Sequence, residues 1–562
     1  MTAYNAPLRD MQFVINELAG LKSLAALPGY EEVTPELAGA VLEEAARLAG
    51  EVLAPLNKPG DERGASLTEG GVVAAYGFGA AYRRFVDNGW NGLGGDPEFG
   101  GQGLPGLVAA ATIEMWNSAN MSYALCPLLT AGATEAIKAH ASDELKNLYL
   151  PKLVSGEWSG TMNLTEPQAG SDLSAVRTRA VPEGDHYRIS GQKIFITWGD
   201  HDMTENVVHL VLARLPDAPE GTRGISLFLV PKFLVGANGS LSKRNDVVCA
   251  SIEHKLGIHA SPTCVMSFGE EEGAIGYLVG RENEGLPHMF TMMNEARQKV
   301  GLQGLGIAEC AYQAARDYAR ERVQGRPVGR RSGDRVTIIQ HPDPAKRRHH
   351  QARVDLLTPV LKGWCTELGV EIASLGIQVF GGMGYIEETG AAQYLRDARI
   401  STIYEGTTGI QAGDLVGRKL TTDGGQTMAA LIGEMRGVEG QLAGSDNLDF
   451  PAIRENLAVG IQALEQATQW MLQTVGRDPD AAFGASVNYM MLTGYVCGGW
   501  QMARAALAAR SRLTADADED FYRAKIATAR FYAEQILPKA NALLAAVKSG
   551  ASTALALEEA QF

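Results

Sequence analysis

Two runs near the middle of the chain decide the fold class: Val207-Val208-His209-Leu210-Val211-Leu212 and Ile225-Ser226-Leu227-Phe228-Leu229-Val230. Each run is short, rich in apolar and β-branched residues, and bounded by turn-forming residues, which is typical of strands. A third stretch, His186-Tyr187-Arg188-Ile189-Ser190-Gly191-Gln192-Lys193, has the pattern of one strand that turns into the next. We therefore predict a compact β domain over residues 161–285.

Helical patterns flank this β domain on both sides. Before it, apolar residues recur at helical spacing over residues 37–48, and after it residues 297–322 form the clearest single helix. Residues 425–562 are rich in alanine and also helical in pattern. The order α, β, α, α lacks the alternation of a doubly wound sheet. The sequence thus predicts a mostly helical α+β chain with domains at 1–160, 161–285, 286–424 and 425–562.

Charge and composition exclude several classes of function. The chain carries 50 Lys and Arg against 65 Asp and Glu, so we expect no nucleic-acid partner. Because no long apolar run and no signal-peptide pattern is present, we expect no membrane span and a cytoplasmic location. The cysteines have no spacing suited to zinc, so no metal is expected. They are Cys126, Cys249, Cys264, Cys310, Cys365 and Cys497.

A loop rich in turn residues opens the β domain: Met162-Asn163-Leu164-Thr165-Glu166-Pro167-Gln168-Ala169-Gly170-Ser171-Asp172. Proline and glycine hold such a loop open, and its hydroxyl and N–H groups suit a flat ligand with many acceptor atoms. A second stretch, Phe195-Ile196-Thr197-Trp198-Gly199, places an aromatic residue beside a threonine. Taken alone, the loop fits a plain turn as well as a ligand site, and the second stretch fits core packing better.

A third stretch holds the candidate base: Ile403-Tyr404-Glu405-Gly406-Thr407-Thr408-Gly409-Ile410-Gln411. Glu405 is preceded by apolar residues and followed by glycine. A carboxylate in such low-dielectric surroundings has a raised pKa, which suits it to remove a proton as a general base. An exposed loop glutamate is the alternative that this stretch by itself leaves open.

These three segments resemble the acyl-CoA dehydrogenase flavoprotein family, and the resemblance covers residues 1–420. The helical tail is similar to the extra C-terminal domain of the family's longer members. Within the family, the chain is most similar to the 3-methylmercaptopropionyl-CoA dehydrogenase-like subgroup, on Tyr4-Asn5-Ala6-Pro7-Leu8-Arg9-Asp10-Met11 and Gly417-Arg418-Lys419-Leu420. The resemblance implies an N-terminal helical domain, a β-barrel-like middle domain, a C-terminal helical bundle and an additional helical domain.

The resemblance also implies FAD as cofactor and assigns roles to residues. Glu405 would be the catalytic base, with Arg297 near it. Thr197 would bond near the flavin N5, and Phe195 would cover the ring at a position where the family often has Trp. The expected cofactor contacts are Met162, Leu164, Thr165, Gly170, Ser171, Phe195, Thr197, Arg322, Gln378, Gly381, Gly382, Thr407 and Gln411. The expected substrate contacts are Ser171, Tyr123, Tyr404 and Gly406.

The implied reaction is the α,β-dehydrogenation of an acyl-CoA thioester. Glu405 would take the α-proton while the β-hydride passes to the flavin, and an electron-transferring flavoprotein would then receive the electrons. Arg322 would contact the FAD pyrophosphate of the neighbouring subunit, and the segment at Gln378 its adenosine part. The protein is therefore expected to be a homo-oligomer, most simply a dimer. The substrate is expected to be 3-methylmercaptopropionyl-CoA or another short acyl-CoA.

Three alternatives stay open. The enzyme could act on medium or long acyl chains, because the depth of the acyl pocket is not readable from one sequence. It could be an acyl-CoA oxidase, which has the same fold and base but uses oxygen. It could be a non-catalytic DNA-associated flavoprotein relative, although the acidic residues of segment 425–562 argue against this.

The chain departs from the family pattern after His341-Pro342-Asp343. These residues lead at once into Pro344-Ala345-Lys346-Arg347, and we expect the next apolar helix to begin near Leu356. About thirty to forty residues are missing relative to the family, enough for one long helix of a bundle. Either the helix is lost or a segment is missing from the sequence. A truly shortened chain is expected to hold FAD at low occupancy.

Overall fold

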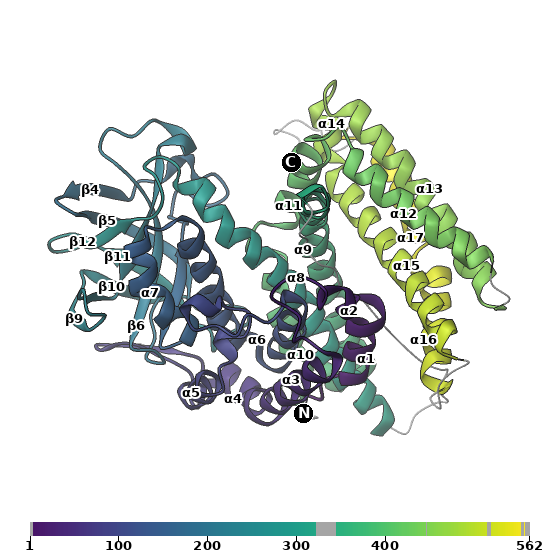
Figure 1. Ribbon diagram of the computed structural model, residues 1–562, viewed down its shortest axis with the longest axis horizontal. Coiled ribbons are helices and arrows are strands. Elements are labelled where there is room, and N and C mark those ends of the chain that lie inside the picture. The colour runs from purple at the N-terminus through teal and green to yellow at the C-terminus, as the bar shows by residue number, and fades with distance from the viewer. Residues whose placement is uncertain (1–3, 322–343, 445–446, 514–518, 552–555, 557–562) are drawn as a thin grey trace. The chain divides into compact units, whose positions relative to one another are not determined.

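The computed structural model describes residues 4–321, 344–444, 447–513, 519–551 and 556 (Figure 1). Contacts divide the chain into two compact units. Unit 1 comprises Met1–Ala6, Glu44–Ala319 and Gly369–Ser401, and unit 2 comprises Pro7–Glu43, Arg320–Leu368 and Thr402–Phe562. These units do not follow the four consecutive segments, so the predicted segment boundaries stay a prediction.

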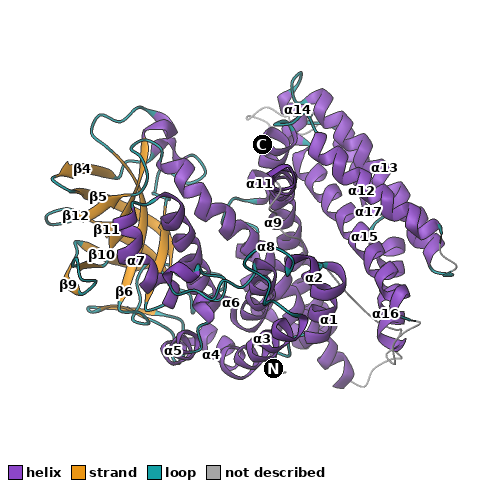
Figure 2. Cartoon of the chain, viewed as in Figure 1, coloured by secondary structure: helices purple, strands orange, loops and turns teal. Residues whose placement is uncertain are grey.

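The predicted β domain is confirmed in unit 1, where the strands gather (Figure 2). An eight-stranded sheet has the order β10-β11-β5-β12-β7-β6-β3, and β4 pairs with both β5 and β6. Strands β4, β5, β12, β7 and β6 thus close into a ring, as expected for a barrel-like domain. The strands are β3 (Trp158–Asn163), β4 (Arg179–Glu183), β5 (His186–Thr197), β6 (Asn206–Arg214), β7 (Ile225–Pro231), β10 (Val247–Ile252), β11 (Thr263–Phe268) and β12 (Ala274–Leu278).

The two runs that predicted the domain form its centre. Strand β7 is buried along its whole length, and β6 along all but its last residue. Strands covered on both faces carry continuous apolar runs instead of alternation, which is why the sequence signal was strong there. Two short hairpins complete the strands: β1 (Ser66–Thr68) with β2 (Gly71–Val73), and β8 (Phe233–Val235) with β9 (Leu241–Arg244).

Helices form the rest of unit 1. Helices α6 and α7 pack on β3 around Tyr149, Leu153 and Trp158, which are fully buried. Helix α6 is interrupted at Asn120, whose backbone is not helical and whose side chain accepts a bond from the Tyr123 N–H. The helices are α4 (Ala54–Arg63), α5 (Phe78–Asp87), α6 (Gly106–His140), α7 (Asp143–Ser155) and α10 (Ala391–Ser401), with parts of α3 (Pro35–Leu48), α8 (Gly285–Glu321) and α9 (Pro344–Phe380).

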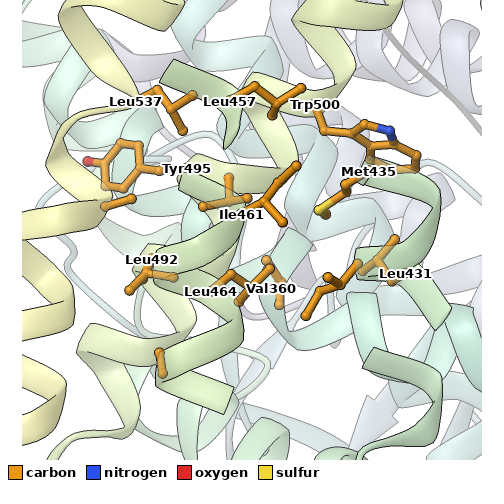
Figure 3. Packing of buried hydrophobic residues seen from close by; sticks show 14 of the residues in the cluster. Val360, Leu431, Met435, Leu457, Ile461, Leu464, Leu492, Tyr495, Trp500 and Leu537 are labelled. Carbon is orange, nitrogen blue, oxygen red and sulfur yellow. The ribbon is translucent and has the colours of Figure 1, made fainter. Parts of the chain in front are cut away.

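Unit 2 is helical and has its own apolar core. Figure 3 shows Leu431 and Met435 from α12, Ile461 from α13 and Trp500 from α15 gathered around Val360 of α9. Long apolar side chains at helical spacing on the alanine-rich helices make this packing possible. Besides its part of α9, the described helices of this unit include α1 (Leu8–Phe13), α2 (Leu21–Leu24), α11 (Thr408–Asp414), α12 (Gln426–Ala443), α13 (Phe450–Thr474), α14 (Pro479–Gly484), α15 (Ser486–Arg512), α16 (Glu519–Phe531) and α17 (Lys539–Ser549).

Helix α9 corrects one expectation. It begins at Pro344 instead of near Leu356, because the polar stretch that precedes the apolar residues is itself helical. Helix α8 ends at Glu321, so Arg322 lies outside the described residues. Among the helices of the described residues, none combines the length and apolar character that a membrane crossing needs.

Candidate active site

The platform loop, which we define as residues 162–172, leaves β3 and is exposed at its tip. Gly170 and Ser171 are exposed, whereas Met162, Leu164 and Thr165 are partly buried. Backbone hydrogen bonds in both directions between Glu166 and Ala169, of 2.9 and 3.0 Å, close a tight turn within the loop. The turn gives the loop a defined shape while its tip stays open to solvent.

A buried ion pair lies under the loop. Lys193 Nζ is 2.7 Å from Glu166 Oε1, and the two side chains are 0% and 3% exposed. Burial raises the pKa of the Glu166 carboxyl, but the Lys193 ammonium and hydrogen bonds outweigh it and hold that pKa below its ordinary value. Burial lowers the pKa of Lys193 to about 8, against the opposing influence of Glu166. Each group thus favours the ionised form of the other against the cost of burial.

Strand β5 carries a β-bulge directly after Lys193. In the pairing of β5 with β11, Lys193 lies opposite Met266 and Ile196 opposite Cys264, so two residues of β5 face one of β11. The bulge residue Phe195 has a φ of 60° and its side chain is 59% exposed. Left-handed backbone at an aromatic residue costs about 1–3 kcal/mol and is concentrated at functional sites.

The bulge and the platform loop are joined by hydrogen bonds. The backbone N–H of Ile194 donates to the Thr165 carbonyl at 2.9 Å, and Lys193 Nζ donates to the Leu164 carbonyl at 3.0 Å. The hydroxyls of Thr165 and Thr197 make no hydrogen bond within the described part of the chain. The structure thus joins the backbone at Thr165 to the bulge that carries Phe195, two residues before Thr197, and the contacts predicted for these three residues with a cofactor stay predictions.

Trp198, three residues after Phe195, is buried in the core and is not exposed at the surface. Its side chain is fully buried, and its Nε1–H donates to the Ser122 carbonyl at 3.1 Å. Its ring stacks against Phe78, with centroids 6.3 Å apart. Of the two aromatic residues in this stretch, only Phe195 presents its ring to solvent.

Glu405 lies in unit 2, on a loop whose backbone is constrained. Its φ is 56° and that of Gly406 is 90°. The buried Gln411 donates from Nε2 to the Glu405 carbonyl at 2.9 Å, and the buried Lys362 donates from Nζ to the Gly406 carbonyl at 2.7 Å. Because surrounding contacts hold it, a strained backbone of this kind can persist at one glutamate.

The first turn of α11 completes this loop. Thr407 is its N-cap and accepts a hydrogen bond of 3.3 Å from the Ile410 N–H, while Thr408 bonds the Glu367 carboxylate. Side-chain capping satisfies backbone donors that a helix start leaves without partners. Thr407 is exposed, and Tyr404, Glu405 and Gly406 are partly buried. The contacts predicted for Thr407 and Gln411 with a cofactor, and for Tyr404 and Gly406 with substrate, stay predictions.

Tyr123 and Arg297, two further predicted site residues, are both buried in unit 1. Tyr123 is fully buried among Phe78, Tyr82 and Phe85, so its ring is part of an aromatic core, and the substrate contact expected of it stays a prediction. Arg297 of α8 is buried in unit 1, with its guanidinium over the Phe290 ring and 3.4 Å from Asn294. Its contact with the base also stays a prediction.

Gln378, Gly381 and Gly382 lie together where α9 ends, and all three are exposed. Gly381 has a φ of 62°, a conformation that glycine adopts without steric cost. The sequence did not single out Glu166, Lys193 and Lys362 as functional candidates. Lysine on a strand or helix is usually solvated, and no local signal distinguishes a buried one.

Comparisons with known proteins agree along the whole chain. Residues 37–157, 161–270 and 343–420 match the N-terminal, middle and C-terminal domains of acyl-CoA dehydrogenases, and residues 427–558 match a domain described as "Acetyl-CoA dehydrogenase C-terminal like". An acyl-CoA dehydrogenase structure complexed with FAD, from Bacillus anthracis, has a TM-score of 0.69 at 19% identity, covers 92% of this chain and 88% of its own, and shows a common fold.

Two relatives match at the level of sequence. The 3-methylmercaptopropionyl-CoA dehydrogenase of Ruegeria pomeroyi is 49% identical over 573 positions, which cover 96% of this chain and 97% of the relative. The broad-specificity linear acyl-CoA dehydrogenase FadE5 of Mycobacterium tuberculosis is 31% identical over 614 positions, covering 100% of both chains. Both alignments have more positions than the 562 residues of this chain. This is expected if the chain lacks residues that its relatives have. The chain belongs to the acyl-CoA dehydrogenase family.

Proposed function

We propose that this protein catalyses the FAD-dependent α,β-dehydrogenation of an acyl-CoA thioester, with Glu405 as the base. One structural observation carries the proposal. Glu405 and Gly406 both have left-handed backbone, and the buried side chains of Gln411 and Lys362 donate hydrogen bonds to the Glu405 and Gly406 carbonyls, respectively. A surface glutamate in an ordinary loop needs no such constraint, whereas a base must be held in a defined position to remove a proton efficiently. The family relationship supports the same assignment.

The residues of the platform loop and the bulge fit a flavin. The exposed Phe195 ring offers an apolar face, and the hydroxyls of Thr165 and Thr197 have no hydrogen-bond partner among the residues that the structure describes. A planar ring system with polar edges matches one aromatic face and two hydrogen-bonding hydroxyls. When bound, FAD supplies the acceptor for the β-hydride, and the chain supplies position and electrostatics.

The proton transfer is assigned to Glu405. An ionised Glu405 carboxylate would accept the α-proton of the thioester through one of its oxygens. The α-proton is made more acidic when the thioester carbonyl oxygen accepts hydrogen bonds, and the Glu405 backbone N–H is the donor proposed from this chain. The constrained backbone at Glu405 and Gly406 would hold both the carboxylate and that N–H in one arrangement.

The substrate proposed is 3-methylmercaptopropionyl-CoA or another short acyl-CoA. Support comes from the Ruegeria relative, which shares 49% identity over nearly the whole chain. Medium or long linear acyl chains are the second candidate, and the relationship to FadE5, a linear acyl-CoA dehydrogenase of broad specificity, is compatible with them. The proposed electron acceptor is an electron-transferring flavoprotein, and an oxidase would instead produce hydrogen peroxide from oxygen.

A homodimer is proposed as the working form. The end of α9 and the turn η7 (Gly381–Tyr385) carry exposed apolar side chains at Leu375, Val379, Met383 and Tyr385, next to Gln378. Leu375 and Val379 are four residues apart within α9, so they lie on one face of its end, and Met383 and Tyr385 follow in η7. Contiguous exposed apolar residues of this kind mark interaction surfaces on soluble proteins.

The test is an anaerobic titration of the FAD-reconstituted protein with acyl-CoA thioesters of increasing chain length. Bleaching of the flavin absorbance by one chain class, and its absence in Glu405→Gln with FAD retained, is the expected result. The matched control is Glu455→Gln, which removes an exposed carboxylate of α13 and should bleach like the wild type. A fully flavinated wild type that no thioester bleaches would overturn the proposal. Hydrogen peroxide formed in stoichiometric yield under air would favour the oxidase.

A further inference from the structure

Glu166 gathers five hydrogen bonds from three segments of the β domain. Besides Lys193, its carboxylate accepts from the backbone N–H groups of Arg177 and Thr178, at 2.7 and 3.0 Å. It also accepts from the Thr178 hydroxyl at 2.6 Å and from Gln168 Nε2 at 2.5 Å. One side chain therefore ties the platform loop to the start of β4 and to β5.

Lys193 holds the platform loop at Leu164, two residues before Glu166. Its ammonium binds the Glu166 carboxylate and the Leu164 carbonyl together, so it holds the backbone directly before Thr165. The next residue of β5, Ile194, donates its N–H to the Thr165 carbonyl instead of continuing the ladder with β11. Phe195 follows in left-handed backbone. The ion pair, the loop and the bulge are thus one connected set of contacts.

Stability alone does not account for this pair. Removing two charges from water is costly, and apolar residues of similar size are often as stabilising as a buried ion pair. What a fully hydrogen-bonded pair adds is a single allowed geometry, because any shift of the loop leaves a buried charge with unsatisfied hydrogen bonds. The residues held in that geometry are those proposed to contact the flavin, Thr165 and Phe195.

We infer that Glu166 and Lys193 are positioning residues for the flavin, which hold the platform loop and the Phe195 bulge in their binding geometry before FAD arrives. This inference rests on the proposed function. Preorganisation of this kind raises affinity because the loop loses little conformational entropy on binding. The pair is buried and is not proposed to contact substrate or reacting atoms, so its effect is expected mainly in FAD affinity and in the flavin environment.

The test measures FAD binding to the apoprotein, by quenching of flavin fluorescence, together with the melting temperature of each variant. Lys193→Met and Glu166→Gln are expected to weaken FAD binding by about tenfold or more, the size of effect that loss of a supporting hydrogen-bond partner has on metal binding in metal sites. The double variant Lys193→Met/Glu166→Gln leaves no unpaired charge. It should recover part of the melting temperature lost by the single variants and keep the weak binding.

The matched control is Lys525→Met in unit 2. Lys525 is also a fully buried lysine, paired with Asp10, so its replacement has a comparable effect on folding without touching the platform loop. Its FAD affinity is expected to equal that of the wild type. Equal FAD affinity in Lys193→Met and wild type would overturn the inference while leaving the enzyme's function intact. A wild type that binds no FAD would overturn the proposed function and this inference together.

Discussion

The side-chain amide of Gln411 donates a 2.9 Å hydrogen bond to the backbone carbonyl of Glu405, six residues earlier in the chain. Gln411 is buried, so water does not compete for this bond. The bond closes the turn in which Glu405 and Gly406 both have positive φ. The conformation of the proposed base therefore depends on a side chain that need not touch substrate.

Replacing Gln411 with leucine should loosen this turn. We expect Gln411→Leu to lower kcat by about tenfold and the free energy of unfolding by about 1–2 kcal/mol, because a buried carbonyl loses its donor. Anaerobic flavin reduction and urea unfolding would measure the two effects. The control is Gln313→Leu, since Gln313 also holds a backbone carbonyl, that of Asn5, at 2.7 Å in unit 1. It should lose stability with kcat unchanged, and equal losses of kcat in both variants would contradict the prediction.

A methyl group at Gly406 should distort the same turn. Gly406 has a φ of 90°, and an added Cβ would lie 2.7 Å from Gln411 Nε2. We expect Gly406→Ala to be destabilised by about 1–3 kcal/mol, from backbone strain and displacement of that amide, and to lose most of its activity. Gly409→Ala in the same segment is the control, because its Cβ would meet only Thr407 Oγ1, at 3.8 Å. Similar melting temperatures for the two variants would refute this expectation.

The pH dependence of stability should change in Asp397→Asn. Burial raises the pKa of Asp397 to about 6 from 3.8, although hydrogen bonds from Ile258 N–H and Gln393 oppose the shift. The folded protein then holds this proton more tightly than the unfolded chain. The stabilising contribution is complete below about pH 4 and is lost as the pH rises through 6, a change of about 2–3 kcal/mol.

The asparagine side chain of the Asp397→Asn variant does not titrate. The variant's amide can still form a hydrogen bond with Gln393 if the Gln393 amide rotates. Its free energy of unfolding relative to the wild type should therefore rise by about 2–3 kcal/mol between pH 4 and pH 7. Urea unfolding at several pH values measures the difference. Parallel stability curves would show that Asp397 is not the group responsible.

The proposed dimer can be tested at the end of α9. Tyr385 is 86% exposed, and Leu375 is also exposed. A charge at a buried interface core is costly, so we expect Leu375→Asp/Tyr385→Asp to shift the molar mass from dimer towards monomer and to weaken FAD binding. Light scattering coupled to size-exclusion chromatography would measure the molar mass. Phe531→Asp, at an exposed aromatic of α16, should leave the mass unchanged. A wild type that is monomeric while fully loaded with FAD would refute the proposed dimer.

The shortening after Asp343 leads to a prediction for the purified protein. A bundle that has truly lost one long helix would give the flavin less support, and for such a chain we expect clearly fewer than one FAD per chain after purification. The ratio of flavin to protein absorbance measures this, and added FAD should raise it. A ratio near one without added FAD would show that the shortened chain keeps its cofactor fully.

The sequence indicated the main features of the fold because they depend on local patterns. Apolar runs at β6 and β7 and helical spacing from α3 to α17 predicted a β domain between helical segments. The quoted loop, the Phe195 stretch and the Glu405 stretch also identified the residues around the candidate site. The start of α9 was misplaced, because its first residues are polar and the prediction relied on apolar spacing alone.

Tertiary structure alone decided how those residues are held. The pairing of Glu166 with Lys193 joins positions 27 residues apart, and that of Lys362 with the Gly406 carbonyl joins positions 44 apart. The sequence by itself determined the fold class, the family resemblance and the identity of the proposed base. Only the folded chain decided that two lysines are buried, that Tyr123 belongs to an aromatic core, and that Phe195 faces solvent. Burial and long-range pairing depend on which segments meet in space, and residue spacing along the chain carries little of that information.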